Sequence, residues 1–129
     1  MKDIQEHIKH WLKSAEHDLK TAESLFTLGH YDFCLFLGHL VLEKTLKAFY
    51  VKTLKMEPPK THNLVLLADR TKLKISDTRK KYLFDVNAFN IETRYSDYRN
   101  DFYKKCTKEF TTENFNKIKE MYKWIKEQL

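Results

Sequence analysis

The segment Arg94-Tyr95-Ser96-Asp97-Tyr98 holds the side chains best suited to binding or chemistry. Arginine offers a planar fork of hydrogen-bond donors that matches a phosphate, and tyrosine rings can stack on nucleic-acid bases. Asp97 can orient Arg94 or accept a hydrogen bond from a ribose hydroxyl. The segment therefore predicts a polar ligand such as a nucleotide or RNA. The alternative is that Arg94 and Asp97 only pair with each other at a helix end while the tyrosines pack.

The position of the histidines limits the chemistry that this segment can do. All six lie at or before His62, so none follows Arg94 in the chain. Histidine is the side chain that most readily moves a proton near neutral pH. His62 itself, in Thr-His-Asn-Leu, is predicted at a helix start, where its ring can bond the backbone or a neighbouring carboxylate. We interpret it as structural.

Further polar residues recur at helical spacing in the second predicted helix, namely Asp32, His39, Glu43 and Lys47. Lys47 is a second candidate phosphate ligand, with His39 and Glu43 as supporting groups. His39 and Glu43 also have the spacing of two helical metal ligands, but no third ligand is evident and we expect no metal. The alternative is a solvated or interface stripe.

Two more supporting residues come from other predicted helices. Asp18 falls on or beside the buried face of the first helix, so its carboxylate needs a basic partner such as Lys44, Lys47 or Arg94. Asn87 lies with Asn90 and Arg94 along one side of a helix, at steps of three and four residues.

The elements that must position these residues are all helical. Two glycines and two adjacent prolines, Pro58 and Pro59, are too few for an all-β domain, which turns every ~8–12 residues. We predict one all-α domain over residues 1–129, an up-and-down bundle of four to five helices. Apolar periodicity and capping residues predict helices from Ile4 to near Gly29, from about Tyr31 to Leu54, shortly after Thr61, from Ser76 or Asp77 to Arg94, and from Thr111 or Thr112 onward.

Composition restricts the environment more than the function. The net charge of +6 fits nucleic-acid contact, yet the lysines are spread over every helix. Cys34 lies in an apolar run and Cys106 in a polar one, which predicts one core and one surface thiol without a disulfide. With no apolar run near the ~20 residues of a membrane span and no signal-peptide block, we expect a cytoplasmic protein without membrane contact.

Several short motifs resemble the HEPN domain family, in order and over nearly the whole chain. They are Ala15, Asp18-Leu19 and Ala22; Tyr31; the run Leu42 to Ala48; Thr61-His62-Asn63-Leu64 and Leu67; and Asn87 with Arg94-Tyr95-Ser96-Asp97. The resemblance implies a helical bundle that pairs into a homodimer with a cleft at the interface. The second helix, which is apolar on nearly every side, also favours a dimer.

What the resemblance implies about function depends on one missing residue. Families of this kind include ribonuclease toxins, companions of small nucleotidyltransferases, and appended nucleotide-binding modules. The ribonucleases use an arginine followed a few residues later by a histidine. Arg94 matches the arginine, but the candidate histidine positions hold Arg99, Asn100 and Asp101.

The sequence therefore predicts a nucleotide- or RNA-binding protein rather than an enzyme. We expect an accessory, toxin–antitoxin-type partner of a small nucleotidyltransferase, with no cofactor and no catalytic residue. Arg94 and Lys47 would hold phosphate, while Tyr95 and Tyr98 would stack. The alternatives are an atypical ribonuclease using Arg94 with Asn100 or Asp101, and a purely structural interaction module.

Overall fold

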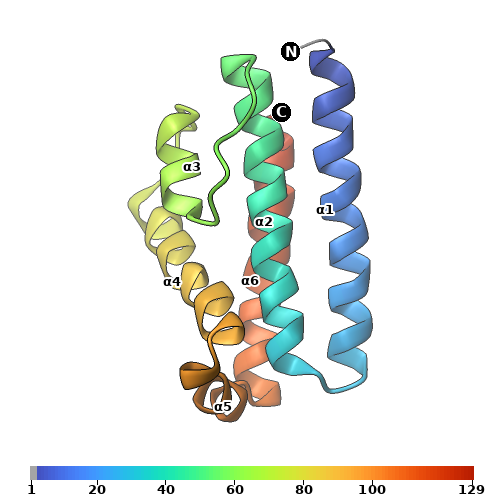
Figure 1. The fold of residues 1–129 in the computed structure, drawn as a ribbon, viewed down its shortest axis with the longest axis vertical. Helices are drawn as coiled ribbons and strands as arrows, with labels where there is room; N and C mark the ends of the chain where they lie inside the picture. Colours follow the sequence, from blue (N-terminus) through green and yellow to red (C-terminus); the bar gives the residue numbers. More distant parts are fainter. Residues whose placement is uncertain (1–2) are drawn as a thin grey trace.

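The structure is a computed structural model that describes residues 3–129, apart from the side chain of Ser96. Met1 and Lys2, the first two residues of the predicted domain, lie outside the described residues. The described residues form six helices, which are α1 (Ile4–Thr27), α2 (Tyr31–Leu54), α3 (Leu64–Arg70), α4 (Asp77–Arg94), α5 (Ser96–Lys105) and α6 (Lys108–Glu127). The chain runs alternately down and up through α1, α2, α4 and α6 (Figure 1).

Helix α2 forms the centre of the bundle. It contacts α1 and α6 most extensively and also touches α3, α4 and α5. Fourteen of its residues are buried, in keeping with the apolar character that its sequence shows on nearly every side. Because neighbours within the chain cover this surface, its apolar character no longer argues for a dimer.

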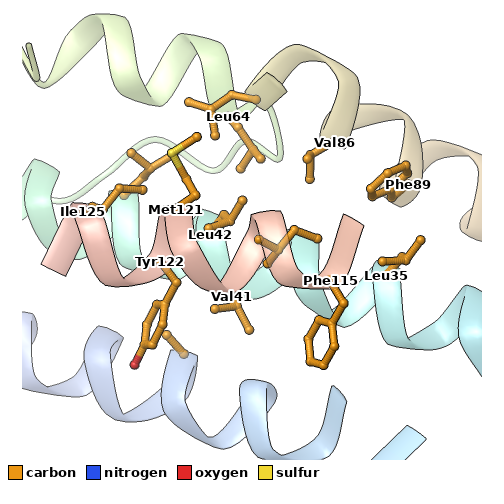
Figure 2. Packing of buried hydrophobic residues seen from close by; sticks show 14 of the residues in the cluster. Leu35, Val41, Leu42, Leu64, Val86, Phe89, Phe115, Met121, Tyr122 and Ile125 are labelled. Atoms are coloured by element: carbon orange, nitrogen blue, oxygen red, sulfur yellow. The ribbon is translucent and has the colours of Figure 1, made fainter. Parts of the chain in front are cut away.

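The hydrophobic core lies between α2, α6, α4 and α3. Side chains of α3 and α4, such as Leu64 and Val86, point toward α2 and α6, whereas Val41 and Tyr122 point toward α1 (Figure 2). Helices α2 and α6 approach closely at Gly38, where an added Cβ would meet Ile118 Cδ1 at 2.8 Å. A side chain at position 38 would therefore force the end of the Ile118 side chain to move.

The sixth helix is the main departure from the sequence prediction. Tyr95 alone separates α4 from α5, with an extended backbone (φ −98°, ψ 123°) that ends one helix and begins the next. Phe102 anchors α5 by packing on Phe89, with ring centroids 5.7 Å apart. The last helix also begins earlier than predicted, because the Thr107 side chain accepts the hydrogen bond from the Phe110 N–H at 3.1 Å.

Both cysteines belong to the interior, which corrects the prediction of a surface thiol. Cys106 is buried like Cys34. It caps the end of α5, with its backbone N–H bonded to the Phe102 carbonyl, and it belongs to the hydrophobic core cluster. Burial raises the pKa of each thiol to about 12. Both side chains are therefore neutral and unreactive near neutral pH.

None of the helices in residues 3–129 is long and apolar enough to cross a membrane.

Candidate functional site

A groove of about 250 Å³ lies between the start of α3 and the C-terminal half of α4. Its lining residues are polar or aromatic with one exception, and they are His62, Asn63, Asn87, Asn90, Ile91, Arg94 and Tyr95. Two segments far apart in the sequence thus supply its two walls. We call it the α3–α4 groove.

Helix α4 supplies the wall that carries the guanidinium group. Arg94 Nη1 donates a hydrogen bond to Asn90 Oδ1 at 3.1 Å, and its guanidinium carbon lies 5.5 Å from the centre of the Tyr95 ring. The Tyr95 side chain is exposed. Because Asn90 is itself buried, it fixes one edge of the guanidinium and leaves other donors of Arg94 for a ligand.

Asn87 connects the two walls. Its Oδ1 accepts a hydrogen bond from the Leu64 backbone N–H at 2.9 Å, and its Nδ2 donates to Asn63 Oδ1 at 3.1 Å. Asn63 also caps α3 by accepting hydrogen bonds from the N–H groups of Val65 and Leu66. The start of α3 is therefore held against α4 by side-chain amides as well as by apolar packing.

The opposite wall presents an imidazole. His62 lies just before α3, its side chain is 55% exposed, and its Nδ1 is 2.7 Å from Glu43 Oε1. The Glu43 carboxylate is buried, and its other oxygen accepts a hydrogen bond from Lys47 Nζ at 3.1 Å. Glu43, itself paired with Lys47, thus contacts Nδ1 of His62. Nε2 is the ring nitrogen that remains available to a ligand.

A fully buried histidine lies beneath the groove. Burial lowers the pKa of His39 to about 4, against the opposing effect of the nearby Glu43 carboxylate. The ring is therefore neutral, and because a carbonyl oxygen can only accept, His39 Nε2 donates to the His62 carbonyl at 2.8 Å. Nδ1 is then the acceptor for Asn90 Nδ2, at 3.4 Å. Through these contacts His39 links the backbone of His62 to the residue that holds Arg94.

A larger groove of about 340 Å³ lies between α4 and α6, but its chemistry is less distinctive. Its charges are mixed, and Lys81 pairs with Asp85 at 3.3 Å while Arg79 stacks on Trp124 at 4.3 Å. Its basic groups are therefore already engaged or opposed by carboxylates. The α3–α4 groove, with Arg94 and His62 on facing walls, is the stronger candidate site.

The HEPN domain family model matches residues 8–128. The chain belongs to the HEPN domain family. Its structure is similar to the crystal structure of the protein TT1696 from Thermus thermophilus, with a TM-score of 0.81 and 19% sequence identity, covering 95% of this chain and 98% of that one. At this identity the similarity shows the fold alone. A comparison with curated proteins gives no match.

In this HEPN domain, the positions after Arg94 at which family ribonucleases were expected to carry a histidine lie away from the groove. Arg99, Asn100 and Asp101 are exposed on α5, none of them lines the α3–α4 groove, and Arg99 Nε donates to the Thr93 carbonyl at 3.2 Å. The groove nevertheless contains an imidazole, because the fold brings His62 to the wall opposite Arg94. Sequence order had suggested that no histidine accompanies this arginine.

The predicted ligand-binding residues divide into two groups. Arg94 and Tyr95 line the groove, as does Asn87. Asp97 and Tyr98 are exposed on α5 and do not line it, and among the described contacts Arg94 bonds to Asn90 rather than to Asp97. The predicted alternative of an Arg94–Asp97 pair is therefore not seen either.

The remaining predicted residues lie behind the groove or away from it. His39 and Glu43 form its polar floor, whereas the Lys47 ammonium is buried, pairs with Glu43 and faces the Trp11 ring at 5.3 Å. The predicted basic partner of Asp18 is confirmed, because Lys44 Nζ lies 2.6 Å from its Oδ2 and joins α1 to α2. Within residues 3–129, no three His, Cys, Asp or Glu side chains are grouped so as to hold a metal ion.

Sequence reasoning missed His62 and Asn63 as groove residues. Their signal was the helix-start motif Thr-His-Asn-Leu, which indicates a cap but not what the cap faces. Only the packing of α3 against α2 and α4 shows that this cap lies beside Arg94 and that the partner of the imidazole is Glu43.

Proposed function

We propose that this HEPN domain binds RNA or a nucleotide in the α3–α4 groove, with Arg94 as the phosphate ligand. Membership of the family supports a nucleotide- or RNA-related role. The observation that carries the proposal is that Arg94 is held by Asn90 in a groove that also contains an exposed tyrosine, two further asparagines and an imidazole.

The groove residues suit the parts of a nucleotide. The guanidinium of Arg94 can donate two parallel hydrogen bonds to a phosphate. Tyr95 offers a ring face for a base, a contact worth ~1–3 kcal/mol. The amide of Asn63 and the imidazole of His62 are placed to bond a ribose hydroxyl or a second phosphate oxygen. Asp97 and Tyr98 remain predicted contacts for a ligand that extends beyond the groove onto α5.

Binding is tested by titrating the full-length protein into fluorescently labelled single-stranded RNA and into nucleoside mono- and triphosphates, with anisotropy or calorimetry as the readout. We expect Arg94→Ala to weaken binding about tenfold or more, because a charge-assisted hydrogen bond contributes about 1.5–3 kcal/mol. Arg70→Ala is the matched control, since Arg70 is exposed at the far end of α3 and does not line the groove. Equal losses in both variants would indicate only a general effect of charge, and would contradict the proposal.

We further propose that the protein forms a homodimer through α4. Phe84, Ile91 and Tyr95 are large, exposed side chains on or directly after this helix, and we call them the α4 stripe. Exposed apolar side chains that gather on one element are typical of interaction surfaces. Because Ile91 and Tyr95 also line the groove, a second copy seated on the α4 stripe would close the groove into a cleft at the interface.

A small nucleotidyltransferase is the protein partner that the family resemblance favours. The test is co-expression of this chain with a nucleotidyltransferase encoded beside its gene, followed by purification on a tag carried by one of them. A stoichiometric complex would support the partnership, and independent elution of the two proteins would contradict it.

A further inference from the structure

A further groove lies between α1 and α6, remote from the α3–α4 groove. Both helices pack on α2, and α2 and α6 lie between α1 and α4 (Figure 1). The Phe26 ring of α1 stacks on the Phe115 ring of α6, with centroids 5.9 Å apart, and closes the seam between the two helices. Toward the start of α1 and the end of α6, the same seam contains a groove of about 400 Å³. We call it the α1–α6 groove.

The floor of this groove is apolar. Ile8 and Leu12 from α1 and Tyr122 from α6 line it, and the Tyr122 ring points toward α1 (Figure 2). Leu12 remains partly exposed, although it packs against a buried cluster that includes Ile8. A ligand that covered this floor would therefore remove apolar surface from water, which is favourable.

The rim of the groove is basic on both sides. Lys9 and Lys13, one turn apart on α1, face Lys126 of α6 across the groove, and all three are exposed. The Lys126 ammonium lies 4.9 Å from the centre of the Tyr122 ring. Within residues 3–129, the ion pairs involve other lysines and none of these three. Their charges are therefore available to a ligand.

A single carboxylate among the described lining residues does not neutralise this rim. Glu16 Oε1 lies 3.5 Å from the ammonium of Lys20, one turn further along α1. This glutamate is thus already paired with a lysine outside the groove. The rim keeps a surplus of positive charge, and a ligand of complementary charge must carry acidic groups.

The combination of floor and rim selects one kind of ligand. An amphipathic helix lying between two helices can place apolar side chains on the floor and carboxylates along the rim. The part of α1 that lines the groove, residues 5–16, spans about three turns, or about 17 Å. RNA would engage the lysines but leave the apolar floor in water. A flat anionic membrane would not reach the floor of a groove.

We propose that the α1–α6 groove docks an acidic amphipathic helix of a partner protein, about three turns long. Carboxylates of that helix pair with Lys9, Lys13 and Lys126, and its apolar side chains cover the floor. The inference does not depend on nucleotide binding, because α2 and α6 separate this groove from α4 (Figure 1). For the same reason, a homodimer formed through the α4 stripe would leave the α1–α6 groove accessible.

The test uses a labelled synthetic peptide with leucines on one helical face and glutamates on the other, titrated with the full-length protein. We expect saturable binding that weakens as salt is added, because exposed charges are screened. A peptide of identical composition in shuffled order has no apolar face and should bind at least about tenfold more weakly. A peptide with lysines in place of the glutamates should not bind.

Substitutions and mapping place the peptide on the protein. Lys13→Glu should weaken binding about fivefold or more, because it replaces an attraction with a repulsion. Lys104→Glu is the matched control, since it changes the net charge equally but alters an exposed residue of α5 outside the groove. In ¹H–¹⁵N spectra, the peptide should shift the amide signals of residues 8–13 and 122–126 rather than those of α4.

Three outcomes would overturn the proposal. They are no binding of the acidic amphipathic peptide, equal binding of the ordered and shuffled peptides, and equal weakening by Lys13→Glu and Lys104→Glu. Single-stranded RNA is titrated in parallel. If Lys13→Glu weakened RNA binding while the wild type bound no peptide, the groove would be a nucleic-acid surface and the proposal would be wrong.

Discussion

His39 is the residue on which the two walls of the groove both depend. It donates to the backbone of His62 and accepts from Asn90, which in turn holds Arg94. These contacts require one particular neutral form of the ring, with its proton on Nε2. Burial enforces the neutral form, because a charged imidazole would have to lose its hydration. A fully buried side chain thus helps to position both the backbone of His62 and the residue that holds Arg94.

This dependence predicts an acid-sensitive fold. Burial lowers the pKa of His39 from 6.5 to about 4. Between these two pH values, His39 is therefore protonated in the unfolded chain but neutral in the folded one. The free energy of unfolding should therefore fall as the pH falls through this window, by up to about 3 kcal/mol. The measurement is urea unfolding at about pH 7.5 and about pH 5. His39→Gln, which keeps an amide donor for the His62 carbonyl, should show a smaller pH dependence than the wild type.

The control for this measurement is His30→Gln, which removes an exposed imidazole that makes no side-chain capping bond. It should retain the pH dependence of the wild type. If the His39 variant and the wild-type protein lost stability in parallel on acidification, His39 would not be the titrating group.

At the scale of elements, the start of α6 offers a clear test of helix capping. Thr107 accepts a hydrogen bond from the Phe110 N–H, whereas the Thr112 hydroxyl only donates to the Lys108 carbonyl inside the helix. Thr107→Ala should lower the free energy of unfolding by about 1 kcal/mol. Thr112→Ala should change it by less than about 0.5 kcal/mol, since alanine is the better helix former. Urea unfolding of both variants decides which threonine is the cap.

The same region shows which elements a sequence reveals and which it conceals. Helix α1 and the core of α6 were predicted because apolar residues recur there at three- and four-residue steps, whereas α2 was predicted from a long apolar stretch with one polar stripe at helical spacing. Helix α5 was missed because Phe102 is its one large buried side chain, too little to make a periodic pattern. The boundary at Tyr95 contains neither glycine nor proline, so no residue type indicated that one helix ends there and another begins.

Only the wall of the groove that α4 supplies could be predicted from the sequence. Asn87, Asn90 and Arg94 could be placed together because they share one side of a single helix. Glu43, His62 and Arg94 come from three separate segments, and their meeting depends on how α3 packs against α2 and α4. Helical periodicity carries no information about that packing, so the sequence did not indicate that the imidazole of His62 lies beside Arg94.

At the scale of the whole molecule, the α4 stripe predicts the oligomeric state. We expect light scattering at micromolar concentration to give the mass of a dimer. Ile91→Glu should shift that mass to a monomer, because the interface would have to bury an unpaired charge. Leu28→Glu is the matched control, since Leu28 is at least as exposed but lies at the end of α1. A monomeric wild type, or equal effects of the two substitutions, would contradict the proposed interface.

Arg94 is the last residue of α4, and this position has an electrostatic consequence for any ligand. The C-terminal end of a helix carries a partial negative charge from its unpaired carbonyl groups. Many phosphate sites gain from the opposite, N-terminal end of a long helix, but at Arg94 the field of α4 itself works against an anion. The guanidinium must first offset that field before it can attract a phosphate. Removing it would therefore do more than delete two hydrogen bonds, because the end of α4 would then favour a cation.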